Sequence, residues 1–351
     1  MRELLTDWLS AERLEALLER AQLCRVGVIG DLALDGYWTA DMTRSLLSRE
    51  TPRFPRPIVR ERYAPGAGGN VAQNLTALGL AQVDVFSVLG RDWRGDIMRR
   101  ELSARSITVD HLILSARRST STYIKPLLTG YESQQEDARL DFENPDPLAP
   151  DLEEALITQV TSAIEALDAL IVADQFEVNG VITDRVREVL IALAAAHPAS
   201  TFVVDSRQRI ERFTTMVLKP NWSEAMRAAG RRARSGDGAP TFDEIAEVAR
   251  ALAERAGRPV CVTLGAAGAL VWDGGPAYVP AAPVRPPLDP VGAGDTFVAA
   301  LTTGLACGAT PAEAAALANL AAAVTVEKIG ETGTATPDEI RARYALTEAA
   351  R

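Results

Sequence analysis

The chain has 351 residues, 47% hydrophobic and 24% charged, a balance typical of a folded globular protein with one large domain or two small ones. Its 47 acidic and 37 basic residues give a net charge of −10, so we expect no nucleic-acid partner, because proteins that bind nucleic acids are usually basic. Two histidines exclude a multi-histidine metal centre, and three cysteines without a CxxC pair favour a reducing compartment over a disulfide framework.

Residues 1–24 carry charges throughout and lack the apolar core of a signal peptide. Their apolar residues follow helical spacing, which predicts one amphipathic helix that packs on the body of the protein or on a partner. No apolar stretch reaches the ~20 residues that a membrane span needs. We therefore expect a cytoplasmic protein with no membrane partner.

Residues 25–345 are expected to form one domain in which strands and helices alternate. Strands are predicted at residues 25–30, 83–89, 169–173, 202–205, 216–218 and 260–264, and helices at residues 69–78, 152–167, 181–196 and 242–256. This order predicts an α/β fold with a mostly parallel sheet covered by helices on both faces, and a ligand site beyond the carboxyl ends of the strands. Two segments, about 32–63 and 107–143, break the alternation and are predicted to form a small β lid.

The strongest chemical signal is DPVGAGDTF at residues 289–297, just before a helix with an apolar face. Gly292 and Gly294 flank Ala293 in a turn that lets backbone N–H groups converge, and the helix N-terminus adds the positive end of its dipole. This turn is predicted to hold a phosphate in transfer. Asp295 beside it can accept a proton from an attacking hydroxyl, although a helix-capping aspartate would give the same local sequence.

Further segments, in the same order, resemble the PfkB or ribokinase-like carbohydrate kinases from about residue 25 to 340. They are GD at 30–31, PGAGGNVAQNLTALG at 65–79, LKPNWSE at 218–224, VTLGAAGALVW at 262–272 and ALANLAAAVTVEKIG at 316–330. The resemblance implies a ribokinase-like fold and a kinase that uses ATP and Mg²⁺ to phosphorylate a sugar hydroxyl. It assigns Asp295 as the general base and the turn of Gly292, Ala293 and Gly294 as the anion hole.

GDLALDGYW at 30–38 and RLDFEN at 139–144 are similar to one branch, the heptose-7-phosphate kinases of lipopolysaccharide precursor synthesis. The chain departs from this branch at SRETP (48–52), DQFEVNG (174–180) and SRQR (206–209), where the branch tends to have SPEAP, DYxKG and PK. Other acceptors therefore stay open, namely a free hexose, a keto-deoxy sugar acid or a nucleoside, as does a non-catalytic sugar sensor. The branch often carries a fused nucleotidyltransferase domain, which we do not expect in a chain of this length.

On the acceptor side, the resemblance implies the sugar-binding residues Asp31, Asp35, Gly66, Gly68, Gly69 and Asn70. A carboxylate at a strand end can grip two hydroxyls, glycines let the backbone approach the sugar, and an amide can both donate and accept. As alternatives to binding the sugar, Asp31 could simply form a turn and Asn70 could simply cap a helix.

Lys125, Arg139 and Asp141 lie in the predicted lid. Arg139 and Asp141 alternate with apolar residues, so on a strand both would face one way. A cation there could bind a phosphate already on the sugar, whereas the alternative is a salt bridge on a solvated strand. Lids of two subunits pairing into one sheet would make a homodimer.

On the nucleotide side, the implied residues are Asn221, Glu224, Thr263, Gly265, Gly268 and Asn319. Asn221 and Glu224 would share a helix face and act near Mg²⁺ and the phosphates through water, or they would form a simple capping pair. Asn319 on an alanine-rich helix is either an adenine contact or a satisfied core amide. The glycines would bring backbone near the nucleotide or form a plain β-turn.

Overall fold

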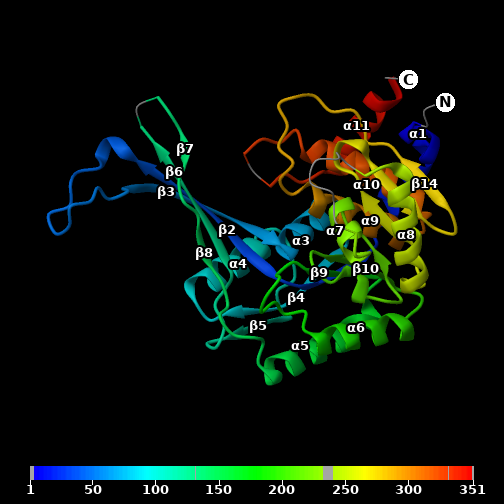
Figure 1. Cartoon of the computed structure of the whole chain (residues 1–351), viewed down its shortest axis with the longest axis horizontal. Coiled ribbons are helices and arrows are strands. Elements are labelled where there is room, and N and C mark those ends of the chain that lie inside the picture. The colour runs from blue at the N-terminus through cyan, green and yellow to red at the C-terminus, as the bar shows by residue number, and fades with distance from the viewer. Residues whose placement is uncertain (1–3, 131, 232–239, 331, 350–351) are drawn as a thin grey trace.

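The computed structural model describes residues 4–130, 132–231, 240–330 and 332–349, and it centres on a nine-stranded sheet (Figure 1). From edge to edge the strands are β14 (Pro276–Val279), β13 (Ala269–Trp272), β12 (Val260–Thr263), β11 (Val217–Leu218), β10 (Thr201–Ser206), β9 (Ala169–Asp174), β1 (Arg25–Gly30), β4 (Gln82–Gly90) and β5 (Leu112–Ser115). All neighbours from β12 to β5 run parallel, whereas the pairs β12–β13 and β13–β14 are antiparallel. The predicted mostly parallel α/β sheet is confirmed.

Helices cover both faces of this sheet, because its central strands are apolar on both sides. In β9, Ile171 packs into one hydrophobic cluster while its neighbours Leu170 and Val172 pack into the other, as the alternation of side chains along a strand requires. The first face carries α2 (Ala11–Ala21), α3 (Gly68–Ala77), α4 (Trp93–Ser103), α9 (Ala293–Ala306), α10 (Pro311–Thr325) and α11 (Pro337–Ala349). The second carries α5 (Pro150–Ala163), α6 (Asp184–Ala196), α7 (Trp222–Ala228) and α8 (Phe242–Ala256). Short 3-10 turns occupy Met42–Arg44, Ile164–Ala166, Ile210–Arg212 and Gly265–Ala267. Within the described ranges, no helix is long and apolar enough to cross a membrane.

The N-terminal segment forms two helices where one was predicted. α1 (Leu5–Trp8) ends before Ser10, whose hydroxyl accepts a hydrogen bond from the backbone N–H of Arg13 (3.2 Å) and starts α2. Serine is a favoured N-cap because its oxygen satisfies an N–H that has no intrahelical acceptor. Leu5, Leu9 and the apolar face of α2 are buried, and α1 contacts α10 and α11, so the segment packs on the body of the chain.

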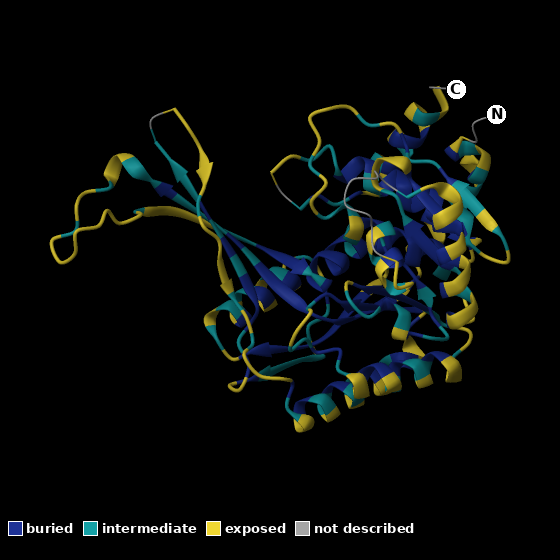
Figure 2. Cartoon of the chain, viewed as in Figure 1, coloured by how far each residue is buried: buried dark blue, intermediate teal, exposed yellow. Residues whose placement is uncertain are grey.

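A second sheet forms the lid. Its strands are β3 (Ile58–Ala67), β2 (Leu32–Asp41), β6 (Thr122–Thr129) and β7 (Gln135–Glu136), with β8 (Leu140–Phe142) also paired to β6. Figure 1 shows this sheet rising from the body as two diverging arms, and Figure 2 shows that their ends are exposed. The predicted lid bounds were partly wrong: β3 continues to Ala67, and Leu112–Ser115 joins the main sheet by pairing in parallel with β4.

The two sheets meet where β1 passes into β2. Gly30 has φ 145°, and a Cβ there would lie 2.1 Å from the carbonyl oxygen of Ala173 in β9, so only glycine fits. The chain therefore changes sheets at the carboxyl ends of β1 and β9, where open α/β sheets bind ligands.

Candidate active site

Helix α9 begins at this same edge. Its N-cap is Gly292 in a left-handed conformation (φ 81°), and a Cβ there would lie 2.9 Å from the side-chain nitrogen of Asn70. Gly294 and Asp295 belong to the first turn, whose N–H groups have no acceptor within the helix. The N–H of Ala293, which was also predicted to bind the anion, instead donates to the carbonyl oxygen of Pro290 (3.2 Å). The turn can therefore offer the N–H groups of Gly294 and Asp295 to an anion.

The Asp295 carboxylate is held from α3. The side-chain amide of Asn70 donates to Oδ2 of Asp295 (2.6 Å), and Gln73 donates to Oδ1 of Asn70 (2.5 Å), which fixes the orientation of that amide. Burial raises the pKa of Asp295 to about 6, opposed by the hydrogen bond from Asn70 and by the positive charges of Lys219 and Arg207. A carboxylate with this pKa is ionised near neutral pH yet basic enough to accept a proton.

Asp295 lies in a cavity of about 270 Å³, here called the polar cavity. Its walls come from the lid, from α3, from the loops after β9 and β10, and from the start of α9. The residues that line it are Ala33, Asp35, Gly66, Ala67, Asn70, Tyr123, Lys125, Arg139, Gln175, Phe176, Arg207, Val291, Gly292, Asp295 and Thr332. The structure thus brings together seven of the predicted residues: Asp35, Gly66, Asn70, Lys125, Arg139, Gly292 and Asp295.

Within the polar cavity, Asp35 and Lys125 face each other across the pair β2–β6. Oδ1 of Asp35 lies 3.6 Å from Nζ of Lys125. Burial raises the pKa of Asp35, and the charge of Lys125 opposes this rise. Gly66 leaves room for this carboxylate, because a Cβ at position 66 would lie 2.6 Å from Oδ2 of Asp35. Asp35 therefore presents a carboxylate that can accept hydrogen bonds from hydroxyl groups.

Asp31 was predicted to grip the sugar, and the structure contradicts this. Its carboxylate is fully buried and accepts three backbone hydrogen bonds, from Gln175 (2.9 Å), Phe176 (2.7 Å) and Val181 (2.8 Å). Burial outweighs these bonds and raises the pKa of Asp31 to about 6. Asp31 holds the loop after β9, which in turn contributes Gln175 and Phe176 to the polar cavity.

Gly68 and Gly69 were also predicted to let backbone approach the sugar, but both lie inside the fold. A Cβ at Gly68 would lie 2.9 Å from the carbonyl oxygen of Asp31, and one at Gly69 would lie 2.9 Å from Cβ of Pro65. These two glycines therefore allow close packing of α3 against the junction of the sheets.

Arg139 and Asp141 share a face of the lid, as their spacing predicted. The Nε and Nη2 atoms of Arg139 each donate to a different carboxylate oxygen of Asp141 (both 2.6 Å), and the guanidinium lies over the ring of Tyr123. Asp141 lines a second space of about 470 Å³, here called the outer cavity, which shares Tyr123, Arg139, Gln175, Phe176 and Arg207 with the polar cavity.

Near the start of α9, Lys219 is buried and its Nζ lies 3.1 Å from Oδ2 of Asp205. Burial alone would lower the pKa of Lys219, but the charges of Asp205, Glu224 and Asp295 outweigh it and raise the pKa. A Cβ at Gly294 would lie 3.8 Å from this Nζ, so a fixed positive charge lies beside the turn that starts α9. The sequence placed Lys219 next to the NxxE motif but did not determine whether it is buried.

Asn221 and Glu224 form the capping pair that was the structural alternative. Oδ1 of Asn221 accepts from the N–H of Glu224 (2.9 Å), and Oε2 of Glu224 accepts from the N–H of Asn221 (2.8 Å). Burial raises the pKa of Glu224, while Lys219 opposes this rise. Over the described ranges, no group of three or more histidine, cysteine, aspartate or glutamate side chains could hold a metal ion.

A third space, of about 240 Å³ and here called the apolar cavity, lies against α9 and α10. It is lined by Gly265, Ala266, Ala281, Ala282, Val284, Leu288, Pro290, Ala293, Asn319, Ala322, Ala323 and Val326. Asn319 is buried and its amide donates to the carbonyl oxygens of Val279 (3.1 Å) and Pro280 (3.0 Å), so it secures the segment after β14. Ala293 borders this cavity while Gly292 and Asp295 border the polar one, so the start of α9 separates the two.

Thr263 and Gly268, also predicted to contact the nucleotide, lie outside the apolar cavity, as Asn221 and Glu224 do. The N–H of Thr263 donates to the carbonyl oxygen of Pro220 (3.0 Å), which joins the end of β12 to the segment before α7. Gly268 (φ 103°) makes the turn into β13, where a Cβ would lie 2.3 Å from the carbonyl oxygen of Val279. Both therefore shape the strand ends, whereas Gly265 borders the cavity itself.

Sequence reasoning missed several lining residues, namely Tyr123, Gln175, Phe176, Arg207 and Thr332. Gln175, Phe176 and Arg207 fall in the two segments, DQFEVNG and SRQR, that depart from the resembled branch. Those departures were the available signal, but the segments lie about thirty residues apart, and only the pairing of β9 with β10 brings them together.

Residues 55–339 match the model of the pfkB family carbohydrate kinases, so the chain belongs to this family. It is similar to proteins named bifunctional protein HldE, with 32% identity over 339 residues in Pelobacter propionicus and 33% over 323 residues in Gluconobacter oxydans. These matches cover 95% and 90% of this chain but 66% and 63% of the relatives, so the chain spans just under two thirds of their length.

Solved structures show the same fold. Arabidopsis thaliana ribokinase complexed with ribose and ATP has a TM-score of 0.66 at 18% identity, covering 92% of this chain and 98% of that one. Escherichia coli phosphofructokinase-2 in complex with substrates and products has a TM-score of 0.69 at 19% identity, covering 92% and 99%. The ribokinase-like fold, with its parallel sheet and separate lid sheet, is confirmed.

Proposed function

We propose that this kinase transfers the γ-phosphoryl group of ATP to a hydroxyl of a heptose 7-phosphate or a closely similar sugar phosphate, with Asp295 as the general base. The observation that carries the proposal is the place of the Asp295 carboxylate, which faces the polar cavity at the first turn of α9 and is oriented by Asn70. The hydroxyl would lie against Asp295, with Asp35 accepting hydrogen bonds from neighbouring hydroxyls.

The turn at the start of α9 and Lys219 would stabilise the transferring group. The N–H groups of Gly294 and Asp295 and the ammonium of Lys219 supply positive charge where negative charge develops. Adenine would occupy the apolar cavity on the opposite side of α9, where its lining is almost entirely aliphatic. The phosphates would then pass over the start of the helix toward the polar cavity.

Glu224 is the residue that would face Mg²⁺, through water, as its motif implied. Its carboxylate accepts one capping hydrogen bond, and a carboxylate has further lone pairs for a hydrated ion. Asp205 and Lys219 lie within electrostatic reach of it. Mg²⁺, when bound with ATP, supplies positive charge at the phosphate oxygens. Turnover should be lost in EDTA and restored by excess Mg²⁺, and this result would support the assignment.

The acceptor assignment depends on two kinds of support. The motifs at 30–38 and 139–144 are similar to heptose-7-phosphate kinases, and three cationic side chains, Lys125, Arg139 and Arg207, line the polar cavity where the acceptor would bind. A phosphorylated sugar would use positive charge there, whereas a neutral hexose would not.

The deciding experiment measures ADP release from ATP and Mg²⁺ over a panel of acceptors. The panel contains a heptose 7-phosphate, hexose phosphates, free hexoses, keto-deoxy sugar acids and nucleosides, with Asp295→Asn as the blank. We expect preferred turnover of the heptose 7-phosphate. Turnover restricted to an unphosphorylated acceptor would contradict the acceptor, and ATP binding without turnover on any acceptor would favour a sensor.

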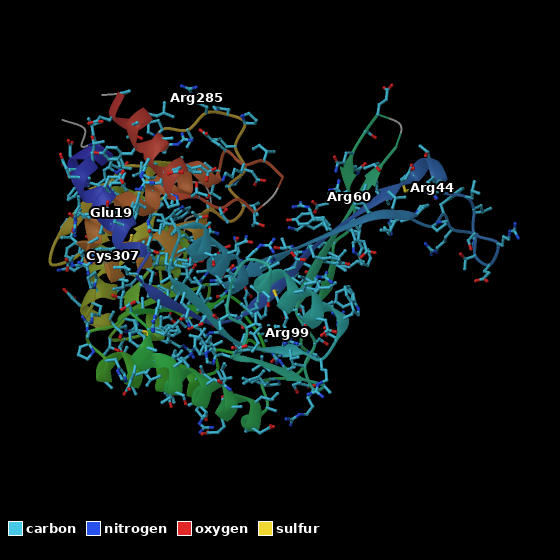
Figure 3. The ribbon with its side chains drawn as sticks, turned by 180° about the vertical axis from the view of Figure 1, so that it is seen from behind. Glu19, Arg44, Arg60, Arg99, Arg285 and Cys307 are labelled. Carbon is cyan, nitrogen blue, oxygen red and sulfur yellow. The ribbon has the colours of Figure 1, made fainter. Side chains whose placement is uncertain are left out.

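We also propose that the lid forms a homodimer. Its outer arm exposes apolar side chains, namely Leu46, Leu47, Phe54, Ile58 and Val59, and Figure 3 shows Arg44 and Arg60 on the same arm. Exposed apolar groups that cluster on a projecting sheet are typical of a subunit contact. In sedimentation velocity, the wild type should be a dimer, and the double variant Phe54→Asp, Val59→Asp should be a monomer. A monomeric wild type would contradict the proposal.

A further inference from the structure

Arg207 occupies the wall shared by the polar and outer cavities. It follows β10, and its backbone N–H donates to the carbonyl oxygen of Asp174 in β9 (3.1 Å). Arg207 is an exposed residue. Its positive charge also acts on Asp295, so the guanidinium lies within electrostatic reach of the reacting group.

The three cations of the polar cavity differ in their partners. Lys125 faces Asp35 at 3.6 Å, and Arg139 is engaged by both oxygens of Asp141. Among the described residues, Arg207 has no carboxylate within salt-bridge distance. Of these three side chains, Arg207 is therefore the one whose charge is available to an incoming anion.

Arg207 is also oriented. Its Nε donates to Oε1 of Gln175 (3.0 Å), which leaves both terminal nitrogens free to bind a ligand. Gln175 is itself buried and held at two points, because its N–H donates to Asp31 and its side-chain Nε2 donates to the carbonyl oxygen of Asp205 (3.2 Å). A guanidinium fixed at Nε presents a planar pair of donors, the geometry that suits a phosphate or carboxylate.

We propose, building on the kinase function proposed above, that Arg207 and Gln175 form an anion clamp that selects acceptors carrying a phosphate or carboxylate away from the reacting hydroxyl. The anion would bind at the shared wall. It would not bind deep in the outer cavity, because Glu143 and Glu177 line that space and would repel it. The acceptor would then extend from Asp295 to Arg207.

The test compares KM and kcat for a heptose 7-phosphate and for the same heptose without phosphate, in the wild type and in Arg207→Gln. We expect Arg207→Gln to raise KM for the phosphorylated acceptor about tenfold or more, because a charge-assisted hydrogen bond is lost. The kcat for this acceptor should stay within a few-fold of the wild-type value. Neither KM nor kcat should change for the neutral heptose. Arg207→Lys should fall between, because it keeps the charge without the paired donors. Gln175→Leu should raise the same KM less strongly.

The matched control is Arg185→Gln. This exposed arginine on α6 pairs with Glu153 and Glu154, none of the three lines the polar or the outer cavity, and the change should leave every constant unchanged. Inorganic phosphate should inhibit the wild type competitively and Arg207→Gln more weakly. Equal effects of Arg207→Gln on both acceptors, or none on the phosphorylated one, would overturn the clamp while leaving the kinase in place. A selective effect on a keto-deoxy sugar acid would support the clamp and overturn the heptose assignment. A wild type that uses only neutral sugars would overturn both.

Discussion

The side-chain amide of Asn70 donates a 2.6 Å hydrogen bond to Oδ2 of Asp295, across 225 residues of sequence. The bond joins α3, which follows directly from lid strand β3, to the first turn of α9. A second link lies one turn away, where Thr296 donates to Oδ1 of Asn74 (2.7 Å). Helix α3 therefore fixes the position of the proposed base, Asp295, relative to the lid.

Asp295→Asn should reduce turnover by about 10²-fold or more, because the amide cannot accept the proton from the hydroxyl. ATP binding and the cooperative unfolding transition should remain, since the side chain keeps its size. Steady-state ADP release and calorimetric ATP titration measure the two properties separately. Asp243→Asn, on the exposed first turn of α8, is the matched control, and near-normal turnover in Asp295→Asn would refute the assignment of the base.

The pH profile of the wild type should show an acid limb near pH 6. The pKa of Asp295 in the free protein is raised to about 6 by burial, and a general base is active only when ionised, so kcat/KM should fall as the pH drops through this value. Asn70→Leu removes a hydrogen bond that lowers this pKa, so its acid limb should move to higher pH. An unchanged limb in Asn70→Leu would mean that another group titrates.

Gly66→Ala should weaken acceptor binding and spare ATP binding. The new Cβ would lie 2.6 Å from Oδ2 of Asp35, and that carboxylate can swing away without unfolding the chain. We expect KM for the acceptor to rise several-fold, KM for ATP to stay constant and the melting temperature to change little. Gly268→Ala is the contrasting variant, because its Cβ would meet the backbone oxygen of Val279 at 2.3 Å and should lower stability.

Asp31→Asn should destabilise the protein by about 1–3 kcal/mol. The change replaces one accepting carboxylate oxygen by an NH₂ group, which is a donor, so backbone N–H groups that now donate to Asp31 lose an acceptor. It should also raise KM for the acceptor, since Asp31 holds the loop that carries Gln175 and Phe176. Urea unfolding gives the first value and initial rates give the second. Asp110→Asn, an exposed aspartate, serves as the control, and wild-type stability in Asp31→Asn would contradict the role assigned to this carboxylate.

Ala323→Leu should fill part of the apolar cavity and raise KM for ATP about tenfold, because the added side chain takes space that we assign to adenine. The KM for the acceptor should not change, since α9 separates the two cavities. Ala312→Leu, on the same helix but outside the cavity, controls for the added volume. Equal effects of both variants on ATP would place the nucleotide elsewhere.

The sequence alone identified the fold, the family and the motif around Asp295, because these depend on short segments in a fixed order. Two glycines before an apolar helix specify the turn at the start of α9, and an Asn–Glu pair three residues apart specifies the capping box of α7. It also predicted a β lid, within bounds that were partly wrong, and a shared face for Arg139 and Asp141, since alternate residues of a strand share a face.

Tertiary structure decided which polar residues face the cavities. Asp31 and Asp35 look alike in sequence, yet Asp31 lies where the chain changes sheets and turns toward the loop after β9, while Asp35 lies within β2 and faces Lys125. Arg207 and Gln175 meet only because β9 and β10 are neighbours in the main sheet. Local patterns specify helices, strands and turns, whereas the direction of a buried carboxylate or a free guanidinium depends on contacts between segments far apart in the chain.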